Sequence, residues 1–574
     1  MKKMKINNLF GALILTSILI FSGCANLEKM KEEASSVQWR VDPSVLEMHG
    51  GQVEATITGE FPSEYFNKEA IVTVTPIIQY EGGQVELEEY VLQGEEVQAN
   101  NKVIGFDAGG SFTHNISAEY SEDMRVSELV VSMQASMGDD QLDLGNTKIA
   151  DGVIATPGLV QVDPKPIIMP DKFNRIKNIE EMADIHYVIN RSYVRRSELT
   201  QEDIQAFEEF IENITGKEQY KVNKAGVSAY ASPDGPIDFN EKLSEDRKES
   251  GQSVLQRRVS DLGVAEENNF YDLKSTTEDW EGFKNLVQNS DIEDKEIILR
   301  VLSMYEDPEV REQELRKMSE AFVVLAEDIL PKLRRSELKI DVDEIGFSDE
   351  EIADYIDSKP DTLDLEEMLY AASLTDDDNK KLEIYQATLE RHPECLRAQN
   401  NVGVMHIKLG DLDAAEDALN AAKEMKDNHP VVNNNLGVIE LEKGNFEAAQ
   451  ELFTQSTDAG QNVNHNLGII AIKNGNYDAA INYLSQSETF NAALAMVLVD
   501  KNSSAMNLLD QLEEQDAMVY YLKAVTAARM DNSNVAFDNL RMAVDREESL
   551  KEMAATDMEF ASYFENETFQ SIVQ

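Results

Sequence analysis

The sequence predicts three domains in series: an antiparallel β-sandwich, a central α/β domain and a C-terminal all-α repeat array. Apolar and polar residues alternate from residue 37 to about residue 160, which is typical of half-buried strands. Strand-like and helix-like segments then alternate over residues 170–346. Beyond residue 361 no strand-like run occurs, and pairs of small residues recur twelve positions apart. The length of 574 residues accommodates all three domains.

The first residues have the layout of an export signal. Three lysines among the first five residues precede a short apolar run, Leu9–Phe21. This run is shorter than the about 20 residues that a transmembrane helix needs. It ends in Phe21-Ser22-Gly23-Cys24, which resembles the lipobox of bacterial lipoproteins, with a Phe where Leu is commoner.

The lipobox resemblance implies that residues 1–23 are a lipoprotein signal peptide and that Cys24 receives the acyl chains, palmitate among them. Residues 24–35 are then a lipidated tether, and several buried acyl chains give stable anchoring. The expected location is the cell outer membrane, with the protein facing the periplasm. The alternative is an ordinary signal peptide with an incidental cysteine.

Residues 36–165 are expected to form the β-sandwich, immunoglobulin-like in architecture only. Val53, Ala55 and Ile57 alternate with polar neighbours, and glycine pairs supply turns between strands. This domain offers no residues with evident chemistry. A stiff, proline-rich connector, Pro157–Pro170, follows it.

Residues 170–346 are expected to form the central α/β domain, with a long helical insertion before its last strand. Ile204, Phe207 and Ile211 stand at helical spacing, and Gly216 ends that helix. The expected elements are strands at 185–188, 220–230 and 337–342, helices at 200–216 and 241–262, and the insertion at 279–330.

A strand, a polar loop and a helix start follow one another within Gly226–Arg247. The helix start has the pattern N-x-x-L-S-x-x-R, formed by Asn240, Leu243, Ser244 and Arg247. This segment resembles the peptidoglycan-binding domain of the OmpA family. The resemblance implies an OmpA-like fold and a site for the peptidoglycan stem peptide. It also implies that Arg247 binds the carboxylate of the diaminopimelate side chain, to which a guanidinium can donate two hydrogen bonds.

The loop before this helix departs from the family pattern. The family's Asp, which pairs with the ligand's ammonium group, would stand eight residues before Asn240, where this chain has Ser232. Asp234 is two residues away and is the other candidate for that charge. Asn240 is expected to cap the helix. The alternative to ligand binding is that Arg247 pairs with acids such as Glu245 on a solvated helix face.

The small residues of the C-terminal region point to helix hairpins. Each pair is followed four positions later by a large apolar residue, which fills the seam where the small residues let two helices approach. A glycine or aspartate seven positions after the first small residue is expected to turn the chain. The pairs are Gly403/Ala415, Gly437/Ala449, Gly468/Ala480, Ala493/Ala505 and Ala524/Ala536.

The segment from Asn435-Leu436-Gly437 to Phe453 resembles the tetratricopeptide repeat, and the resemblance implies a solenoid over residues 361–574. In that family the concave face binds peptides, often through an Asn two residues before the first-helix Gly. Asn401, Asn435 and Asn466 occupy that place, so the resemblance implies a peptide-binding face for an unidentified protein partner. The alternative is that these amides brace neighbouring helices.

The composition excludes several classes of function. With 52 Lys and Arg against 108 Asp and Glu, the net charge is −56, which disfavours nucleic acid as a partner. Two cysteines exclude a disulfide scaffold, and the seven histidines show no metal-binding spacing. No nucleotide-binding loop or hydrolase motif occurs, so we expect no enzyme, cofactor or metal. Basic residues gather in the central domain, which favours an anion site there: Arg191, Arg195, Arg196, Arg247, Arg257, Arg258, Arg334 and Arg335.

The sequence therefore favours a non-enzymatic cell-envelope lipoprotein that docks on peptidoglycan through its OmpA-like domain and recruits protein partners through its repeats. The alternative is a scaffold subunit of an envelope secretion, fimbrial or surface assembly, in which the OmpA-like domain no longer binds peptidoglycan. Ser232 favours the alternative, whereas Asn240 and Arg247 favour the first function.

The substitution Cys24→Ala should abolish lipidation, because it removes the only sulfur at the expected cleavage point. Incorporation of radiolabelled palmitate measures this, with Cys395→Ala as the matched control that should keep the label. Unchanged labelling of Cys24→Ala would contradict the lipoprotein assignment.

Overall fold

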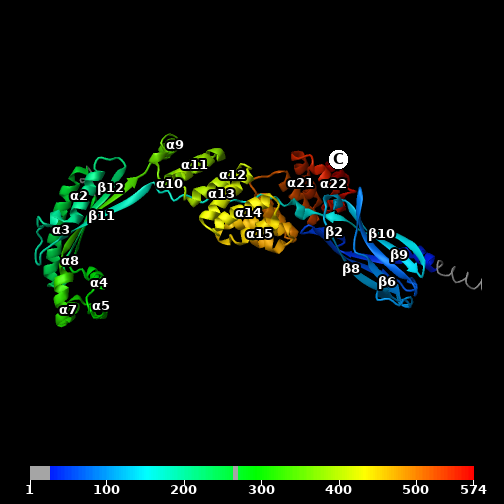
Figure 1. Ribbon diagram of the computed structural model, residues 1–574, viewed down its shortest axis with the longest axis horizontal. Coiled ribbons are helices and arrows are strands. Elements are labelled where there is room, and N and C mark those ends of the chain that lie inside the picture. Colours follow the sequence, from blue (N-terminus) through cyan, green and yellow to red (C-terminus); the bar gives the residue numbers. More distant parts are fainter. Residues whose placement is uncertain (1–25, 263–268) are drawn as a thin grey trace, which may run out of the picture. The chain divides into compact units, whose positions relative to one another are not determined.

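The computed structural model describes residues 26–262 and 269–574, except for the side chains of residues 319–321. The predicted signal peptide and Cys24 lie outside these residues. The chain forms two compact units: one comprises the residues up to Met169 together with Leu389–Gln574, and the other comprises Pro170–Thr388. The first unit therefore combines the β-domain with most of the helical array (Figure 1).

The β-domain contains ten strands in one continuous hydrogen-bonded sheet. The strand order is β1-β3-β2-β10-β9-β4-β6-β7, with β5 paired to β4 and β8 paired to β3. The predicted sandwich of two separate sheets differs from this arrangement, because β2 pairs with β3 on one side and with β10 on the other. The strands are β1 (Gln38–Asp42), β2 (Val45–His49), β3 (Gln52–Phe61), β4 (Ile71–Tyr80), β5 (Gly83–Glu86), β6 (Tyr90–Gly94), β7 (Lys102–Ile104), β8 (Gly110–Glu119), β9 (Ser127–Met137) and β10 (Asp140–Ile154).

Alternation along the strands produces the core of the β-domain. Val53, Ala55 and Ile57 of β3 are buried, while their neighbours along the strand are more exposed, as the period of two predicts. Val53 and Ile57 share one apolar cluster with Ile78 of β4 and Leu129 of β9. The two groups of strands joined through β2 therefore bury a common core.

The predicted tether is part of the β-domain where the structure describes it. Residues 26–32 are helical, and Leu27 and Met30 are only 1% and 2% exposed. Both side chains pack in a cluster with Phe61 and Phe66. The expectation of a free tether up to residue 35 was wrong, because two apolar residues three apart on one helix turn are sufficient to attach the segment to the core.

The central unit has a four-stranded sheet in the order β11-β14-β12-β13. Strands β12 and β13 are parallel, and the other two pairings are antiparallel. Helices α2 and α3 share the apolar core with the sheet. The elements are β11 (Ile176–His186), α2 (Glu202–Ile214), β12 (Tyr220–Tyr230), α3 (Ile237–Val259), β13 (Tyr271–Thr276) and β14 (Arg335–Ile345).

Two features of the central unit differ from the sequence prediction. Strand β13 was not predicted, because its alternation covers six residues, Tyr271–Thr276, with Asp272 and Lys274 among them. Strand β11 starts nine residues before the predicted strand at 185–188. It is the first strand in the sheet order, and most of its early residues are polar and exposed, so they give no apolar signal.

The predicted helical insertion is present and has an apolar core of its own, which includes Phe283, Val287, Ile298 and Leu302. Another helix, α9 (Asp349–Ser358), lies between the segments predicted as the central domain and the repeat array, and Ser348 and Glu351 form a capping box at its start. The insertion helices are α4 (Trp280–Gln288), α5 (Lys295–Met304), α6 (Pro308–Lys317), α7 (Ser319–Val324) and α8 (Leu330–Leu333); α10 (Leu365–Ala371) and α11 (Asp378–Arg391) follow α9.

Five helix hairpins follow, at the positions that the small-residue pairs predict. A Cβ atom added at Gly437 would lie 2.7 Å from a ring carbon of Phe453, and one at Gly468 would lie 2.5 Å from Leu484. The expected large residues therefore do fill the space that the glycines leave. The hairpins are α12 (Leu396–Lys408) with α13 (Leu412–Met425), α14 (Pro430–Glu442) with α15 (Phe446–Thr454), α16 (Gln461–Lys473) with α17 (Tyr477–Leu484), α18 (Phe490–Leu498) with α19 (Asn502–Gln511), and α20 (Ala517–Arg529) with α21 (Ser533–Arg546).

The predicted turn residues adopt the left-handed conformation that the hairpins need. All five have positive φ, between 54° and 81°. Three are glycines, which reach this conformation without a Cβ penalty, and two are aspartates, whose side chains tolerate it. They are Gly410, Gly444, Gly475, Asp500 and Asp531.

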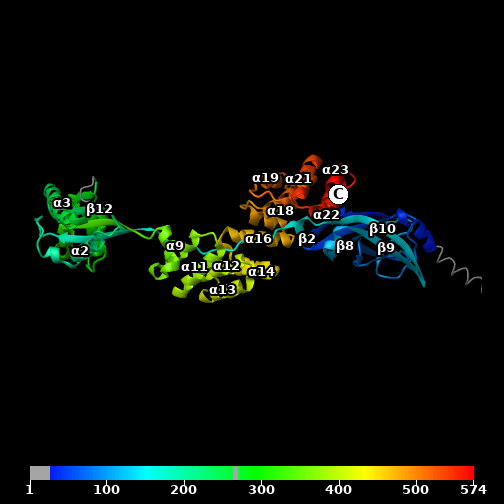
Figure 2. The ribbon, with the colours of Figure 1, turned by 90° about the horizontal axis from the view of Figure 1, so that it is seen from above.

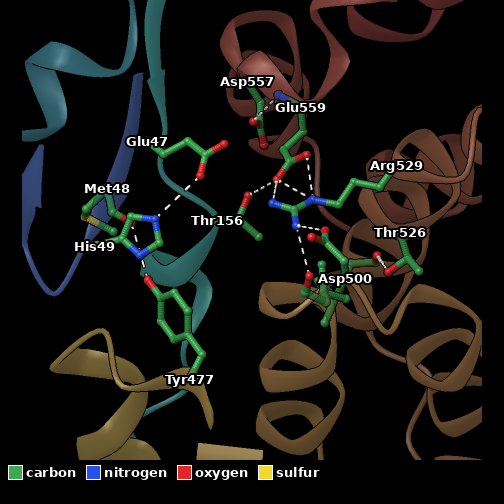
Figure 3. Close-up of polar contacts among 12 residues, drawn as sticks. Glu47, Met48, His49, Thr156, Tyr477, Asp500, Thr526, Arg529, Asp557 and Glu559 are labelled. Atoms are coloured by element: carbon green, nitrogen blue, oxygen red, sulfur yellow. Dashed lines mark hydrogen bonds and ion pairs between the residues drawn. The ribbon is translucent and has the colours of Figure 1, made fainter. Parts of the chain in front are cut away.

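The array closes on α22 (Leu550–Thr556), a 3₁₀ segment (Met558–Tyr563) and α23 (Glu567–Val573). Figure 3 shows how this end meets the start of the connector. Arg529 donates through Nε to both carboxylate oxygens of Glu559 at 3.0 Å, and Glu559 accepts a further hydrogen bond from the hydroxyl of Thr156. The pair with Arg529 holds the Glu559 carboxylate in place, and the bond from Thr156 attaches the β-domain side of the unit to the last repeats.

The substitution Gly437→Leu should destabilise the array by about 1–3 kcal/mol, because the added side chain would overlap Phe453. Hydrogen exchange of the α14 and α15 amides in the full chain measures the loss. Ala448→Leu, at an exposed position of α15, is the matched control. Equal protection in the two variants would contradict the helix pairing.

Candidate functional site

A cavity of about 370 Å³ opens in the central unit between the end of β12 and the start of α3. Its lining includes the four residues that the sequence assigned to an anion site: Ser232, Asp234, Asn240 and Arg247. Arg334, which precedes β14, lines the same cavity. The strand–loop–helix sequence thus brings the predicted residues to one place.

Asn240 shapes the loop and does not cap the helix. Helix α3 begins at Ile237, three residues before Asn240, so its N-cap position is Pro236. The side-chain amide of Asn240 instead donates to the carbonyl oxygens of Ser232 at 3.1 Å and Gly235 at 3.0 Å. Asn240 therefore fixes the conformation of the loop that forms one wall of the cavity.

Arg247 is fully buried and only partly satisfied. Its Nε donates to the carbonyl of Arg191 at 3.1 Å and its Nη1 to the carbonyl of Tyr230 at 2.7 Å. Its Nη2 is buried and has no hydrogen-bond partner among the residues that the structure describes. The guanidinium lies over the ring of Tyr187, 5.1 Å from its centroid, and burial lowers the pKa of Arg247 to about 10.

The alternative that Arg247 pairs with Glu245 on a solvated face was wrong. Glu245 forms an ion pair with Lys248 one turn along the helix, while Arg247 faces the core. Positions 245 and 247 lie on different faces of α3, since neighbours on a helix surface are three or four residues apart.

The charge of Asp234 is already engaged inside the cavity. Its Oδ2 lies 3.1 Å from Nη2 of Arg334, and Nε of Arg334 donates to the hydroxyl of Ser232 at 3.1 Å. The Ser232 hydroxyl in turn donates to Oδ1 of Asp234. Two guanidinium groups and one carboxylate give the cavity a net positive charge. The sequence did not indicate that Arg334 pairs with Asp234, because the two residues stand 100 positions apart.

The second candidate site is the face of the repeats that carries Asn401, Asn435 and Asn466. The connector of the same chain lies along this face as an extended segment, and Figures 1 and 2 show it in cyan beside the array. Each asparagine makes two hydrogen bonds to one connector residue: its Oδ1 accepts from the backbone N–H and its Nδ2 donates to the backbone carbonyl.

Four such pairs run along the connector in reverse order to the repeats. The two distances in each pair lie between 2.7 and 3.2 Å. Asn491 of α18 is a fourth member that the sequence analysis missed, because Ala493 replaces the marker glycine of that repeat. The pairs are Asn401 with Met169, Asn435 with Ile167, Asn466 with Lys165, and Asn491 with Gln161.

The asparagines also connect the repeats to one another. Nδ2 of Asn435 donates to Oδ1 of Asn400 at 2.9 Å, and Nδ2 of Asn466 donates to Oδ1 of Asn434 at 3.0 Å. The two alternatives for these amides, holding a main chain and bracing neighbouring helices, are therefore both realised. The main chain that they hold here belongs to the connector.

Among the residues that the structure describes, His465 and Asp163 are the one pair of ionisable side chains in contact between the connector and the face that carries the asparagines. Nε2 of His465 lies 3.1 Å from Oδ1 of Asp163, and Asn491 donates to the same oxygen at 3.1 Å. Burial acts to raise the pKa of Asp163, but hydrogen bonds from His465 and Lys165 outweigh burial and hold that pKa below its ordinary value.

Within residues 26–262 and 269–574, no group of three or more His, Cys, Asp or Glu side chains is arranged to hold a metal ion. Over the same residues, none of the helices combines the length and the apolar character that crossing a membrane requires.

Comparison with known proteins identifies the repeats. Residues 382–430 and 461–493 each match a family model of the tetratricopeptide repeat. The C-terminal region therefore contains tetratricopeptide repeats, which act in general as non-enzymatic scaffolds for protein–protein interaction. No curated protein matches the chain.

Several solved structures are similar over part of the chain. The tetratricopeptide protein YrrB is 19% identical over 29% of this chain and 94% of its own, with a TM-score of 0.25. PilF of Pseudomonas aeruginosa is 16% identical over 37% and 98%, with a TM-score of 0.30. A tetratricopeptide protein from Parabacteroides merdae is 16% identical over 43% and 98%, with a TM-score of 0.28.

The substitution Asn435→Ala should lower stability by about 1–3 kcal/mol, because it removes the acceptor of the part-buried Ile167 N–H and one of the two amide donors to the Ile167 carbonyl. Equilibrium denaturation of the full chain, followed by hydrogen exchange at residues 161–169, measures the effect. Asn482→Ala, on an exposed face of α17, is the control. Unchanged exchange at Ile167 in Asn435→Ala would contradict the pairing.

Proposed function

We propose that this protein is a non-enzymatic scaffold of a bacterial cell envelope, lipid-anchored to the outer membrane through Cys24. Its central domain docks on peptidoglycan, and its tetratricopeptide repeats recruit protein partners. The observation that supports docking is the cavity of the central unit, where the predicted residues converge and the buried Nη2 of Arg247 lacks a partner. The observation that supports recruitment is the presence of the repeats.

A carboxylate is the ligand chemistry that suits the cavity best. Leaving a buried charged donor unpaired is costly, and a carboxylate oxygen at Nη2 would satisfy it with a charge-assisted hydrogen bond. The net positive charge of Arg247, Arg334 and Asp234 together favours an anion. The stem peptide of peptidoglycan presents such a carboxylate on its diaminopimelate side chain.

A second candidate function follows from Asp234. Its carboxylate is paired with Arg334, so the ammonium group of diaminopimelate lacks a free anion in this cavity. Apolar side chains near the cavity are also exposed: Ile189 by 50%, Phe239 by 45% and Ile237 by 38%. Exposed apolar groups around a polar cavity are typical of a protein interface. This arrangement favours a scaffold subunit of a secretion, fimbrial or surface assembly that no longer binds peptidoglycan.

The full mature chain should co-sediment with purified peptidoglycan sacculi, and Arg247→Ala should weaken that binding by about 10- to 100-fold. The reason is that a charge-assisted hydrogen bond contributes about 1.5–3 kcal/mol. Arg257→Ala, at an exposed position on the same helix, is the matched control and should bind like the wild type. Free diaminopimelate should displace the wild-type chain from the sacculi, a readout that needs no variant.

Two loop variants separate the candidate functions. Ser232→Asp should tighten binding, because it supplies a second carboxylate beside Arg334 and so leaves one for the ligand's ammonium group. Asp234→Ala weakens binding if Asp234 faces the ammonium group and strengthens it if Arg334, once released, takes a ligand carboxylate. A wild-type chain that stays in the supernatant would overturn peptidoglycan docking and leave the second candidate.

A further inference from the structure

The connector presents alternate residues to the repeats. The N–H groups that the asparagines accept belong to residues at odd positions: Gln161, Lys165, Ile167 and Met169. Within the part of the connector that lies on the asparagines, residues 161–170, the prolines stand at even positions, at 164, 166 and 170. A proline has no N–H to donate, and an extended chain directs successive residues to opposite sides. The proline spacing thus fits a strand that is paired along one edge only.

The groove formed by these asparagines recognises a main chain more than particular side chains. Each of the four asparagines satisfies both the N–H and the carbonyl of one residue, as a neighbouring strand would. Side-chain preference enters at three apolar positions. Val160 and Met169 are 7% and 6% exposed within clusters of repeat residues, and Ile167 packs against the first of these clusters.

We propose that the chain's own residues 161–169 act as an intramolecular competitor in the peptide-binding groove that the repeat family leads us to expect here, and so regulate the access of partner segments to it. The ligand class is an extended segment with free N–H groups at every second residue, proline tolerated between them, and apolar residues at the places of Ile167 and Met169. A partner segment of this kind binds in the groove only when the connector leaves it. This inference rests on the proposed recruitment of protein partners by the repeats and not on peptidoglycan binding.

Because the connector belongs to the same chain as the groove, it competes strongly with a free peptide even if its own contacts are weak. The connector continues into folded segments at both ends, η3 (Thr156–Leu159) and strand β11, so it stays close to the groove when released. A tethered ligand of this kind has an effective concentration on the order of millimolar. A free peptide of about 10 μM intrinsic affinity would then bind the full chain about 100-fold more weakly than it binds an empty groove.

The hydrogen bonds that hold the connector in the groove can be replaced by water or by another segment. Apart from the bonds that the Asp163 side chain makes with His465 and Asn491, the hydrogen bonds between the connector and the asparagines of the repeats join neutral amides to main-chain groups. Such bonds contribute about 0.5–1.5 kcal/mol each, since water replaces them on release. The prolines also limit the conformations of the released segment and so reduce the entropy that it loses on return.

The test uses the full chain and a fluorescent peptide of the connector sequence, Val160–Met169. In the double variant Lys165→Pro/Ile167→Pro, each proline ring would meet an asparagine Oδ1 that now lies 2.7 Å from the backbone nitrogen. This should expel the connector and raise the affinity for the peptide by about 100-fold over the wild type. Val162→Pro/Ile168→Pro is the matched control, because it adds two prolines at even positions and should bind like the wild type.

Two further measurements complete the test. Asn435→Ala, added to the first double variant, should reduce peptide binding again if the peptide occupies the same groove. In the unmodified chain, the amides of Lys165 and Ile167 should exchange with solvent faster than those at the centres of α14 and α16, because the connector leaves while the repeats stay folded. Equal peptide affinity in wild type and double variant, or exchange at Ile167 only with global unfolding, would overturn the proposal.

Discussion

The bidentate pairing between asparagine side chains and the connector backbone is the constraint on which the first compact unit depends. The paired residues are 232 positions apart at one end of the ladder and 330 at the other. The connector cannot lie among buried helices unless its N–H and carbonyl groups find partners, because an unpaired buried main-chain group costs as much as a lost hydrogen bond. Four repeats each supply one amide that satisfies both groups.

Neutral amides suit this task in a chain of such high charge. With a net charge of −56, a ladder of carboxylates would repel itself and would offer no donor for the connector carbonyls. Burying charged groups would add a desolvation cost that amides avoid. The four ladder asparagines are at most 1% exposed, so their own polar atoms are satisfied by the connector and by Asn400 and Asn434. The same bonds therefore position the connector and hold consecutive repeats in register.

The parts of the fold that the sequence predicts are those set by local spacing. The twelve-residue pairing of small residues, the seam residues and the turn residues recur at fixed distances, and each was found where expected. The missed elements lack such a pattern: β13 is short and partly polar, and Leu27 and Met30 give too few apolar positions. The segment that fills the groove could not be predicted. The asparagines indicate that a main chain binds there, but they do not specify which main chain. The proline alternation was visible, but its register against the asparagines required the structure.

In the cavity of the central unit, too, the tertiary partners of the site residues could not be predicted from the sequence. The two sites also differ in their chemistry. The family resemblance of the segment Gly226–Arg247 implied that Ser232, Asp234, Asn240 and Arg247 belong to one site, but not that Arg334 pairs with Asp234 or that Arg247 is fully buried. Electrostatic partners depend on tertiary contacts, so they carry no periodic signal. The groove is filled and binds its occupant mainly through neutral amides, whereas the cavity is open and lined by charged side chains. Salt screens interactions between charges far more than it weakens amide pairing, so we expect segment binding in the groove to depend mainly on competing strands and anion binding in the cavity to depend on ionic strength.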